Sequence, residues 1–471
     1  MPFDDNGNVI SFDEARQKRK RKLPVGELTE LQMADLLVER AGSEIRYCAP
    51  LGGWHAWTGT HWGLDIKESV RERVKALAYE LAEGAASSLD ADLFRSARRA
   101  GSDRGITAIL ALARSTPTVV FSPDEADQDP WILNCQNGML DLRTALLAPH
   151  DRAALITRSC AAPYQPEATA PTWERFLEEI QPDPEVRAYL SRLFGYAALG
   201  LIRDHVLGVL WGSGANGKSV LADVVSHVLG DYARPGPSSL LVVNGHHEPH
   251  PADMATCAGS RLVIVHETKR GAAFDSSKVK LLTGGDRLTA RHMRQDFFTF
   301  APTHTLVMLS NYQPQADASD AALWRRIHLV PFGVVIPEER RDTQLAERIR
   351  STEAAGVLRW VVAGALEWQR RGLDPPAVIR EQTERYRASE DNVAAFLADD
   401  CTIMPGLKIQ AGVLYAAARK WAERNGARVP SARDFAAEIA GRGFEKRRGA
   451  KGEFYYGISL QAEELEDRFR D

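Results

Sequence analysis

The pattern of apolar and polar positions divides the chain into a polar tail and three folded regions. Residues 1–26 show no apolar periodicity, and we expect them to form a disordered basic tail. The folded regions are predicted from changes in periodicity and from breaks rich in proline or glycine. Their expected boundaries are residues 27–170, 171–375 and 376–471.

The first folded region combines helical periodicity with two short hairpins, which predicts a mixed α and β domain. Helical spacing covers residues 27–40 and 66–114, and the second stretch is long enough for more than one helix. The aromatic segment Trp54–Trp62 contains a central glycine and predicts a hairpin. A second strand–turn–strand is predicted for residues 131–142, where Asn137-Gly138 separates two apolar runs.

The second folded region begins with two predicted helices, at residues 173–180 and 184–200. Residues 203–335 then alternate short apolar runs with helical or loop segments, which is typical of an α/β domain. Helical periodicity resumes at residues 338–371, and Asp374-Pro375-Pro376 ends it. The pattern therefore predicts an α/β fold with helices before and after the sheet.

The third folded region has the pattern of a small winged-helix-like domain. Helices are predicted at residues 413–424 and 432–440, and a hairpin at 444–458 turns at 449–452. Three consecutive cations lie on the near strand of this hairpin: Lys446, Arg447 and Arg448. Such a wing either contacts a DNA phosphate backbone or serves only as a structural cap, and the sequence leaves both interpretations open.

Composition places the chain among ordinary soluble proteins and leaves a nucleic-acid role open. The 471 residues are 44% hydrophobic and 26% charged, with a formal net charge of −4. Global charge therefore does not indicate nucleic acid, but local patches decide binding. The basic run at residues 16–22 is either a solvated tail or an electrostatic arm for DNA.

The cysteines and the N-terminus argue against several classes of protein. The five cysteines are scattered without a C-x-x-C pair, so neither a zinc site made of sulfur ligands alone nor a disulfide framework is expected. Residues 1–26 lack the apolar core of a signal peptide, and no stretch approaches the ~18 apolar residues of a membrane helix. We expect no membrane partner and a cytoplasmic location, in a bacterial cell or in the host of a phage or plasmid.

A phosphate-binding loop follows the first apolar strand of the α/β region. Residues 206–211 predict the strand, and residues 220–229 have helical period up to Gly230. The loop consists of Gly212, Ser213, Gly214, Ala215, Asn216, Gly217, Lys218 and Ser219. Its glycines let backbone N–H groups point at phosphates, and the helix N-terminus adds a favourable dipole. We expect ATP here, with Lys218 bridging its β- and γ-phosphates and Ser219 holding Mg²⁺.

Two further apolar strands lead to polar residues that suit a nucleotide site. The first, at residues 262–266, precedes Glu267, which is expected to orient Mg²⁺ or the attacking water. Many ATP-driven motors have two adjacent acids at this point, and His266 stands where the first would be. Which residue holds the metal and which activates the water therefore stays open. The second, at residues 305–310, leads to Asn311, whose amide is a candidate contact for the γ-phosphate or the water.

Basic residues cluster in two further places. A hairpin is predicted beyond Gly284-Gly285, with strands that run to about Arg291 and to Phe300. The candidates for gripping DNA phosphates on and before this hairpin are Lys280, Arg291, His292 and Arg294. Later, Arg325 and Arg326 precede an apolar strand, where an arginine supplied across a subunit boundary stabilises transition-state charge.

This order of motifs resembles the superfamily 3 helicases and, within them, the phage, plasmid and poxvirus primase–helicase family. The resemblance covers roughly residues 30–460 and includes W-x-x-W-x-G-x-x-W at Trp54–Trp62 and Gly195-Tyr196. It implies an AAA+-like hexameric ring around single-stranded or forked DNA, with ATP at the subunit interfaces. The residues implied to act in one subunit are Lys218, Ser219, Glu267 and Asn311, and Arg326, with Arg325 in reserve, would reach the neighbouring subunit.

The resemblance also sets expectations about priming. Many relatives carry a primase domain ahead of the motor, whereas fewer than ~30 residues precede the shared region here. Asp90-Ala91-Asp92 has the D-x-D spacing of a two-metal site but lies in a helical stretch, so we predict no primer synthesis by this chain. A separate primase or replication initiator is an expected partner. A non-helicase P-loop ATPase with a regulatory or packaging role, and an inactive DNA-binding ring, remain the alternatives.

Overall fold

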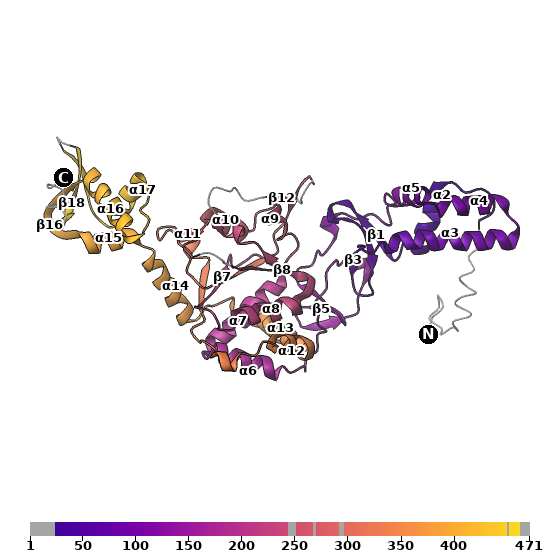
Figure 1. The fold of residues 1–471 in the computed structure, drawn as a ribbon, viewed down its shortest axis with the longest axis horizontal. Coiled ribbons are helices and arrows are strands. Elements are labelled where there is room, and N and C mark those ends of the chain that lie inside the picture. The colour runs from indigo at the N-terminus through magenta and orange to yellow at the C-terminus, as the bar shows by residue number, and fades with distance from the viewer. Residues whose placement is uncertain (1–23, 244–250, 267–269, 292–295, 450–451, 462–471) are drawn as a thin grey trace. The chain divides into compact units, whose positions relative to one another are not determined.

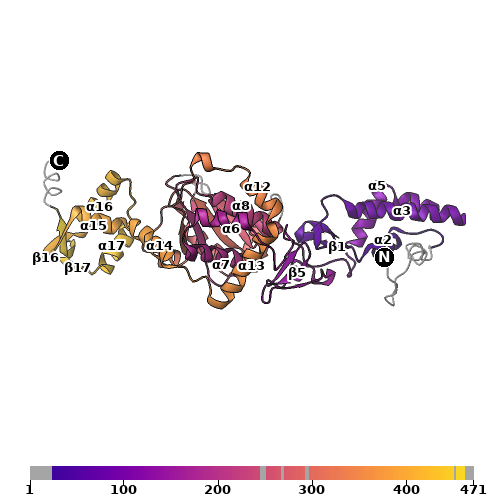
Figure 2. The same cartoon turned by 90° about the horizontal axis from the view of Figure 1, so that it is seen from below.

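The computed structural model describes residues 24–243, 251–266, 270–291, 296–449 and 452–461. The chain divides into two compact units, residues 1–166 with 228–232 and residues 167–227 with 233–471. Figures 1 and 2 show the first unit in indigo and purple and the second in magenta to yellow. Each unit has its own hydrophobic core.

Helices supply most of the core of the first unit. Their bounds are α2 (Glu30–Ala41), α3 (Ser69–Ser88), α4 (Ala91–Ala100) and α5 (Asp103–Ala113). The stretch 66–114 divides into three helices because Leu89 ends α3 in the left-handed conformation (φ 57°), while Asp90 and Ser102 cap the next two helices. Asp90 of the D-x-D sequence thus accepts the backbone N–H of Leu93 at 2.9 Å and serves as a helix cap.

Two antiparallel sheets of three strands complete the first unit. Their strands are β1 (Ile45–Cys48), β2 (Gly53–Trp57), β3 (Trp62–Leu64), β4 (Ile132–Cys135), β5 (Gly138–Asp141) and β6 (Leu146–Ala148). Strands β2 and β3 form the aromatic hairpin predicted from the sequence, with Trp57 opposite Trp62 and the ring centroids 5.4 Å apart. The hairpin β4–β5 is also present, but it turns at Gln136-Asn137 because Gly138 already pairs with Cys135.

The second unit is built on a parallel five-stranded sheet in the order β15–β7–β14–β10–β8. The bounds are β7 (Leu207–Trp211), β8 (Ala233–Gly236), β10 (Leu262–His266), β14 (Thr305–Ser310) and β15 (Ile327–Pro331). All residues of β14 are buried, as expected for a strand of a parallel sheet covered on both faces. The α/β class predicted for this region is confirmed.

Helices accompany the sheet along the whole region. They are α6 (Pro171–Ile180), α7 (Pro184–Leu199), α8 (Lys218–Leu229), α9 (Pro251–Ala255), α10 (Ser276–Leu282), α11 (Ala321–Trp324), α12 (Leu345–Thr352), α13 (Ala354–Arg371) and α14 (Ala377–Ser389). Helices α7 and α13 lie side by side (Figure 1), in backbone contact at Gly195 and Gly364. A Cβ at Gly195 would lie 2.1 Å from the backbone nitrogen of Ala365, so a larger residue would force the helices apart.

Two small antiparallel pairs flank the parallel sheet. Strand β9 (Val242–Val243) pairs with β11 (Ala273–Phe274). Strand β12 (Leu288–Arg291) pairs with β13 (Phe297–Phe300), so both strands of the predicted basic hairpin are present. Its turn, residues 292–295, lies outside the described residues.

Helix α14 belongs to the core of the parallel sheet, although the boundary predicted at residue 376 assigns it to the C-terminal region. Its Tyr386 stacks edge-on against Trp324 at 4.9 Å between ring centroids and belongs to the core of the sheet. Thr383 Oγ1 accepts the backbone N–H of Leu329 in β15 at 3.0 Å. The separate C-terminal core begins only at Val393. The proline pair marks a break between two helices, and the change of core follows α14.

The C-terminal region has the element order helix–strand–helix–helix–strand–strand. Its bounds are α15 (Asn392–Asp400), β16 (Cys401–Gln410), α16 (Ala411–Asn425), α17 (Ala432–Gly441), β17 (Lys446–Gly449) and β18 (Gly452–Leu460). The sheet order is β16–β18–β17. Strand β16 was not predicted, because Pro405-Gly406 interrupts its alternation at the point where its register against β18 shifts.

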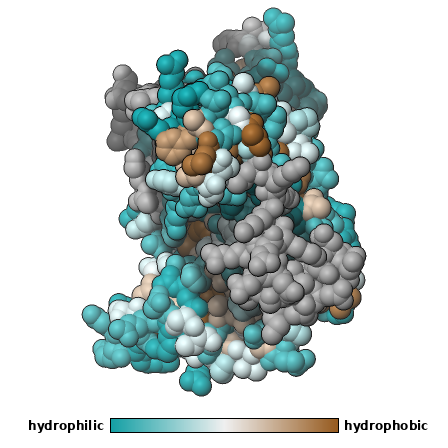
Figure 3. Space-filling model, turned by 90° about the vertical axis from the view of Figure 1, so that its right-hand side faces the viewer, coloured by the Kyte–Doolittle hydropathy of each residue, from teal (hydrophilic) through white to brown (hydrophobic). Residues whose placement is uncertain are grey.

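Figure 3 shows one face of the molecule, on which polar residues predominate and apolar residues gather in small patches. Within the described ranges, no helix has the length and apolar character needed to cross a membrane.

Candidate functional site

The glycine-rich loop connects β7 to α8 at the carboxyl end of the parallel sheet. Gly214, Ala215 and Gly217 adopt positive φ angles of 102°, 50° and 80°, which lets the backbone curl tightly. A Cβ at Gly217 would lie 2.4 Å from Ile180 Cγ2, so glycine is required there for packing as well as for backbone conformation. The chain therefore forms the strand–loop–helix that the sequence predicts.

Lys218 is the centre of a buried polar cluster. Lys218 is only 4% exposed. Its Nζ donates to the Gly212 carbonyl at 2.7 Å and to Asn216 Oδ1 at 3.0 Å. Asn311 Oδ1 is a third acceptor, at 3.3 Å. Burial lowers the pKa of Lys218 to about 8, since the ammonium has lost water without gaining a carboxylate.

Asn216 ties this cluster to the edge strand of the sheet. It is 2% exposed, and its Nδ2 donates to the carbonyl of Phe332, just beyond β15, at 3.2 Å. The next connection is between backbones, where Ile336 N–H donates to the Ala215 carbonyl at 2.8 Å. Sequence reasoning placed Asn216 in the loop but missed this link, because its partner lies 116 residues away.

The carboxyl ends of β7, β14 and β10 lie at the same edge of the sheet. Strand β14 pairs with β7 so that Ser310 lies opposite Trp211, and β10 pairs with β14 so that His266 lies opposite Leu309. Asn311, directly after β14, thus lies at the same edge of the sheet as the loop. Its Oδ1 accepts a hydrogen bond from Lys218 Nζ. Exposed His266 ends β10, and Glu267 lies outside the described residues.

The two described basic candidates of the hairpin region, Lys280 and Arg291, have different partners. Lys280 in α10 makes an ion pair with Asp320 at 2.9 Å. The Arg291 guanidinium lies over the ring of Phe297, 5.0 Å from its centroid, at the end of β12. His292 and Arg294 lie outside the described residues. The hairpin therefore presents Arg291 at its described end, whereas Lys280 is held by a carboxylate.

Arg325 and Arg326 have opposite environments. Arg326 is 8% exposed, and it donates from Nε to Thr283 Oγ1 at 3.0 Å and from Nη1 to the Ala322 carbonyl at 2.6 Å. Burial lowers the pKa of Arg326, and the positive charge of Arg325 lowers it further. The Arg325 side chain is exposed and makes no hydrogen bond or ion pair with another described residue, while its backbone N–H donates to the Ala321 carbonyl at 3.2 Å.

The three cations of the C-terminal hairpin are divided by the pleat of β17. Lys446 forms an ion pair with Glu453, and Arg447 forms one with Glu445 at 2.5 Å. Arg448 is exposed, with no polar partner in the part of the chain that the structure describes. Because alternate residues of a strand point to opposite faces, Lys446 and Arg448 share one face and Arg447 lies on the other.

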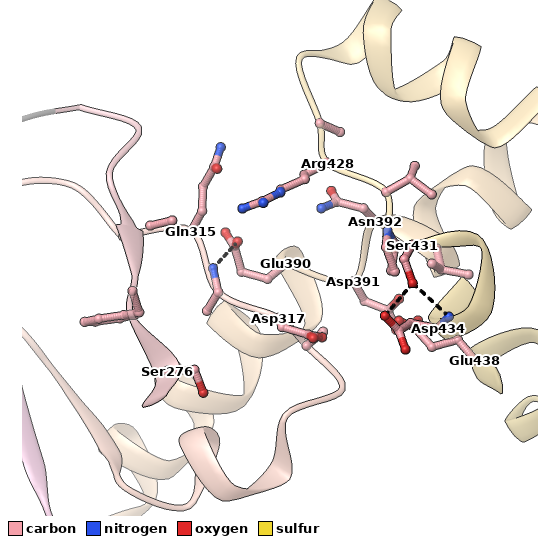
Figure 4. Close-up of a pocket in the computed structure, with 18 of the residues that line it drawn as sticks. Ser276, Gln315, Asp317, Glu390, Asp391, Asn392, Arg428, Ser431, Asp434 and Glu438 are labelled. Carbon is pink, nitrogen blue, oxygen red and sulfur yellow. Dashed lines mark hydrogen bonds between the residues drawn. The ribbon is translucent and has the colours of Figure 1, made fainter. Parts of the chain in front are cut away.

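A separate cavity of about 530 Å³ lies within the second unit, between the end of α14 and the loop before α17. The carboxylates that line it are Asp317, Glu390, Asp391, Asp434 and Glu438, and Arg428 is its arginine (Figure 4). Burial raises the pKa of Glu390 and of Glu438. A lining so rich in carboxylates repels phosphate, so this cavity does not suit a nucleotide.

Two ranges of the chain match known families. Residues 34–182 match the family described as D5 N terminal like. Residues 210–326, which hold the loop, β10 and the two arginines, match a family of unknown function (DUF5906).

Curated proteins similar to this chain come from DNA viruses. A protein of Acanthamoeba polyphaga mimivirus named "putative helicase" is 26% identical over 333 residues, covering 65% of this chain and 35% of that protein. One of Invertebrate iridescent virus 6, also named "putative helicase", is 25% identical, covering 59% and 32%. A "putative primase" of African swine fever virus is 28% identical, covering 58% and 31%. The chain spans about a third of the length of these relatives.

Solved structures of the apo C-terminal region of NrS-1 are also similar in part. One is 12% identical and has a TM-score of 0.39, covering 63% of this chain and 77% of that chain. A TM-score of this size does not establish a common fold.

Proposed function

The chain fits a D5-like primase–helicase family, as the order of its motifs indicates, and on this premise we propose that it is an ATP-dependent DNA helicase of superfamily 3 type. It would translocate on single-stranded DNA during replication of a phage, prophage or plasmid. The observation that carries the proposal is the position of Lys218 in a glycine-rich loop, 3.3 Å from Asn311 at the end of the neighbouring strand.

The order of the parallel strands supports an AAA+-like motor. The strand that carries the loop, β7, lies between β14, which leads to Asn311, and β15, which follows the arginines. A movement of the nucleotide-binding loop can therefore be transmitted directly to both neighbouring strands, β14 and β15. The link from Asn216 to Phe332 is one such route.

The proposed chemistry is phosphoryl transfer from ATP to water. The backbone N–H groups of residues 212–217 and the Lys218 ammonium would hold the phosphates, and Asn311 would orient the attacking water. Bound Mg²⁺ would supply Lewis-acid stabilisation of the developing phosphate charge. Ser219, exposed at the start of α8, and Glu267, directly after β10, are the residues proposed to hold it.

The order expected from the sequence has Arg326 first, with Arg325 in reserve, as the arginine that acts across a subunit boundary. The environments of the two side chains favour the reverse order. Arg326 is already committed to Thr283 and Ala322 in its own subunit. We therefore place Arg325, which is exposed, first, and Arg326 second. A finger of this kind implies a homo-oligomeric ring, for which a hexamer is the proposed size.

DNA contacts are proposed for the basic hairpin and for the C-terminal hairpin. The residues concerned are Lys280, Arg291, His292 and Arg294 in the first and Lys446, Arg447 and Arg448 in the second. Forked DNA and a separate primase or initiator are the proposed partners. All these residues would grip phosphates without reading bases.

The proposal is tested by hydrolysis and unwinding assays on Lys218→Ala. We expect single-stranded DNA to stimulate ATP hydrolysis by the intact chain, and the chain to unwind a forked duplex. Both activities should disappear in Lys218→Ala, because the γ-phosphate loses its cation. Lys75→Ala, which removes a surface lysine of α3 paired with Glu72, is the control and should retain both activities.

One observation favours a second candidate. His266 ends β10 at a position where many motors have an acid, which weakens the case for rapid hydrolysis. An inactive DNA-binding ring would bind ATP and DNA with no hydrolysis. A non-helicase P-loop ATPase would show DNA-stimulated hydrolysis without unwinding on several fork geometries.

A further inference from the structure

The C-terminal sheet has one face packed on its core and one face that no other described element covers. Ile409, Tyr455 and Ile458 point inward and belong to the C-terminal core. The residues that alternate with them point outward, and the register places Lys408 opposite Tyr456 and Arg447 opposite Phe454. We call these four residues, Lys408, Arg447, Phe454 and Tyr456, the outer platform. Figure 1 shows β16 and β18, which carry all of them except Arg447, near the C-terminus, and Figure 2 labels β17, which carries Arg447.

The outer platform pairs each aromatic ring with a cation. Lys408 Nζ lies 6.0 Å from the ring centroid of Phe454, and Arg447 Cζ lies 5.1 Å from that of Tyr456. Tyr456 is 37% exposed, and Phe454 is half-buried. The two rings come from positions i and i+2 of one strand, so they are about 6.8 Å apart along it and face the same side.

The solvent-facing side of an antiparallel sheet normally carries polar residues, so two neighbouring rings on that side indicate a binding surface. Adjacent rings flanked by cations suit the two parts of a single nucleic-acid strand, because bases stack on the rings while phosphates meet the cations. Paired bases of a duplex are stacked on each other and cannot use such a surface. The carboxylate of Glu445 engages Arg447 through Nε and Nη2, which leaves Nη1 to meet a phosphate.

We propose that the outer platform is a binding site for single-stranded DNA that works by base stacking, on the face of the sheet opposite Lys446 and Arg448. Two successive bases lie on Phe454 and Tyr456, and the backbone runs past Lys408 and Arg447. This site is separate from the motor and does not require ATP. The inference rests on the proposed function only for its class of ligand.

Affinity measurements on the full chain without nucleotide test the proposal. A fluorescein-labelled oligo(dT) and a duplex of the same length are titrated with the intact chain and with Phe454→Ala, Tyr456→Ala and the double variant. Each single substitution should weaken oligo(dT) binding about tenfold, because each removes one stacking ring, and leave the duplex almost unchanged. Phe454→Tyr keeps a ring and should restore affinity. Tyr79→Ala removes an exposed ring of α3 and is the matched control.

Photocrosslinking locates the contact independently of affinity. A 5-bromodeoxyuridine-substituted strand, irradiated with the full chain, should crosslink to the peptide that contains β18, and the double variant should lose that crosslink. Unchanged thermal unfolding of the variants shows that they are folded, as expected for side chains on an open face. If the intact chain binds oligo(dT) but the double variant binds as well as Tyr79→Ala and β18 is never crosslinked, this inference is overturned and the proposed helicase stands. If the intact chain binds neither single-stranded nor forked DNA, both are overturned.

Discussion

The phosphate-binding loop and the C-terminal sheet both present cations, but they hold them in opposite ways. Lys218 is 4% exposed and has three oxygen acceptors from the loop and from the end of β14. The Arg447 side chain is 59% exposed and has one carboxylate partner. A buried cation acts at a fixed point in a low-dielectric site, whereas an exposed cation follows a mobile strand of phosphates. Lys218 is therefore suited to act on the reacting phosphates of a nucleotide, and Arg447 to hold the backbone of a nucleic acid.

This difference has a physical consequence for substitutions. Removing a buried group that makes several hydrogen bonds leaves other polar groups unpaired, so the effect on activity or stability is large and specific. Removing an exposed cation costs one screened phosphate contact, so the effect is small and depends on salt.

The arginine pair gives the largest expected effect, because it places both signatures in adjacent residues. Arg325→Ala should lower DNA-stimulated ATP turnover by about 10³-fold or more, with no change in stability, since an arginine finger contributes that much to the rate. Arg326→Ala should instead destabilise the folded chain by about 1–3 kcal/mol, because Thr283 and the Ala322 carbonyl lose their donor. Steady-state ATPase assays and urea unfolding of both variants separate the two effects.

Mixing subunits tests whether Arg325 acts on a neighbour. Arg325→Ala and Lys218→Ala damage different halves of a shared site, so a mixture should recover part of the activity that neither variant has alone. A mixture that stays inactive at every ratio argues against action in trans. A large loss of turnover in a stable Arg326→Ala would return that residue to first place.

Asn216 is expected to give the next largest effect, because it connects the lysine to β15. Asn216→Ala removes an acceptor of Lys218 and the donor to Phe332, and ATP affinity should fall about 10- to 100-fold, as for loss of hydrogen bonds that involve a charged group. Asn216→Asp keeps an acceptor for Lys218 and loses the donor to Phe332, but its negative charge also repels phosphate, so its loss of affinity should be at least as large as that of Asn216→Ala. A fluorescent ATP analogue measures the affinity. Equal affinity in all three proteins would mean that the link has no role in binding.

The titration of Lys218 gives a pH dependence that the exposed cations lack. In the nucleotide-free chain its pKa is about 8, below its ordinary value because of burial. Bound phosphates favour the charged form and raise this pKa, so binding takes up a proton above pH 8. Below pH 8 the lysine is charged in both states, and its contribution is constant. ATP affinity should therefore fall about fivefold between pH 8 and pH 9 as protonation of the free lysine is lost.

Calorimetry in buffers of different ionisation enthalpy measures this proton uptake directly. Ser219→Ala is the matched variant, because it weakens Mg²⁺ binding while keeping the lysine, and its pH dependence should be unchanged. Affinity that stays level from pH 7 to pH 9.5 would show that burial does not shift the titration of Lys218 as the structure indicates.

The sequence carried most of the information about the loop, because the motif is local. A strand, a turn with glycine at positive φ and a helix follow one another within residues 207–229, so periodicity and glycine positions predict them. The parallel strands were equally clear as apolar runs ending in polar residues. What pattern alone could not show was the link from Asn216 to Phe332, which depends on the pairing of β15 with β7.

The C-terminal sheet was harder to predict, for two physical reasons. Strand β16 contains Pro405-Gly406, which interrupts its alternation where its register against β18 shifts, so no strand was predicted there. The run from Lys446 to Arg448 read as one basic patch, although a strand sends alternate residues to opposite faces. Lys408 was missed because its neighbours across the sheet come from β18, far along the chain.

The smallest expected effect distinguishes cations within the C-terminal sheet itself. Arg448 is exposed with no described partner, whereas Lys446 is paired with Glu453. If both face a phosphate, Arg448→Ala should lower the slope of log affinity against log salt by about 0.9 for duplex DNA, and Lys446→Ala by less, because the carboxylate already screens that lysine. Affinities at several salt concentrations measure both slopes. Equal changes would mean that Glu453 releases Lys446 on binding, and no change in either would leave this face as a structural cap. The affinity for ATP should stay the same in both variants, because these residues take part in grip and leave the buried site intact.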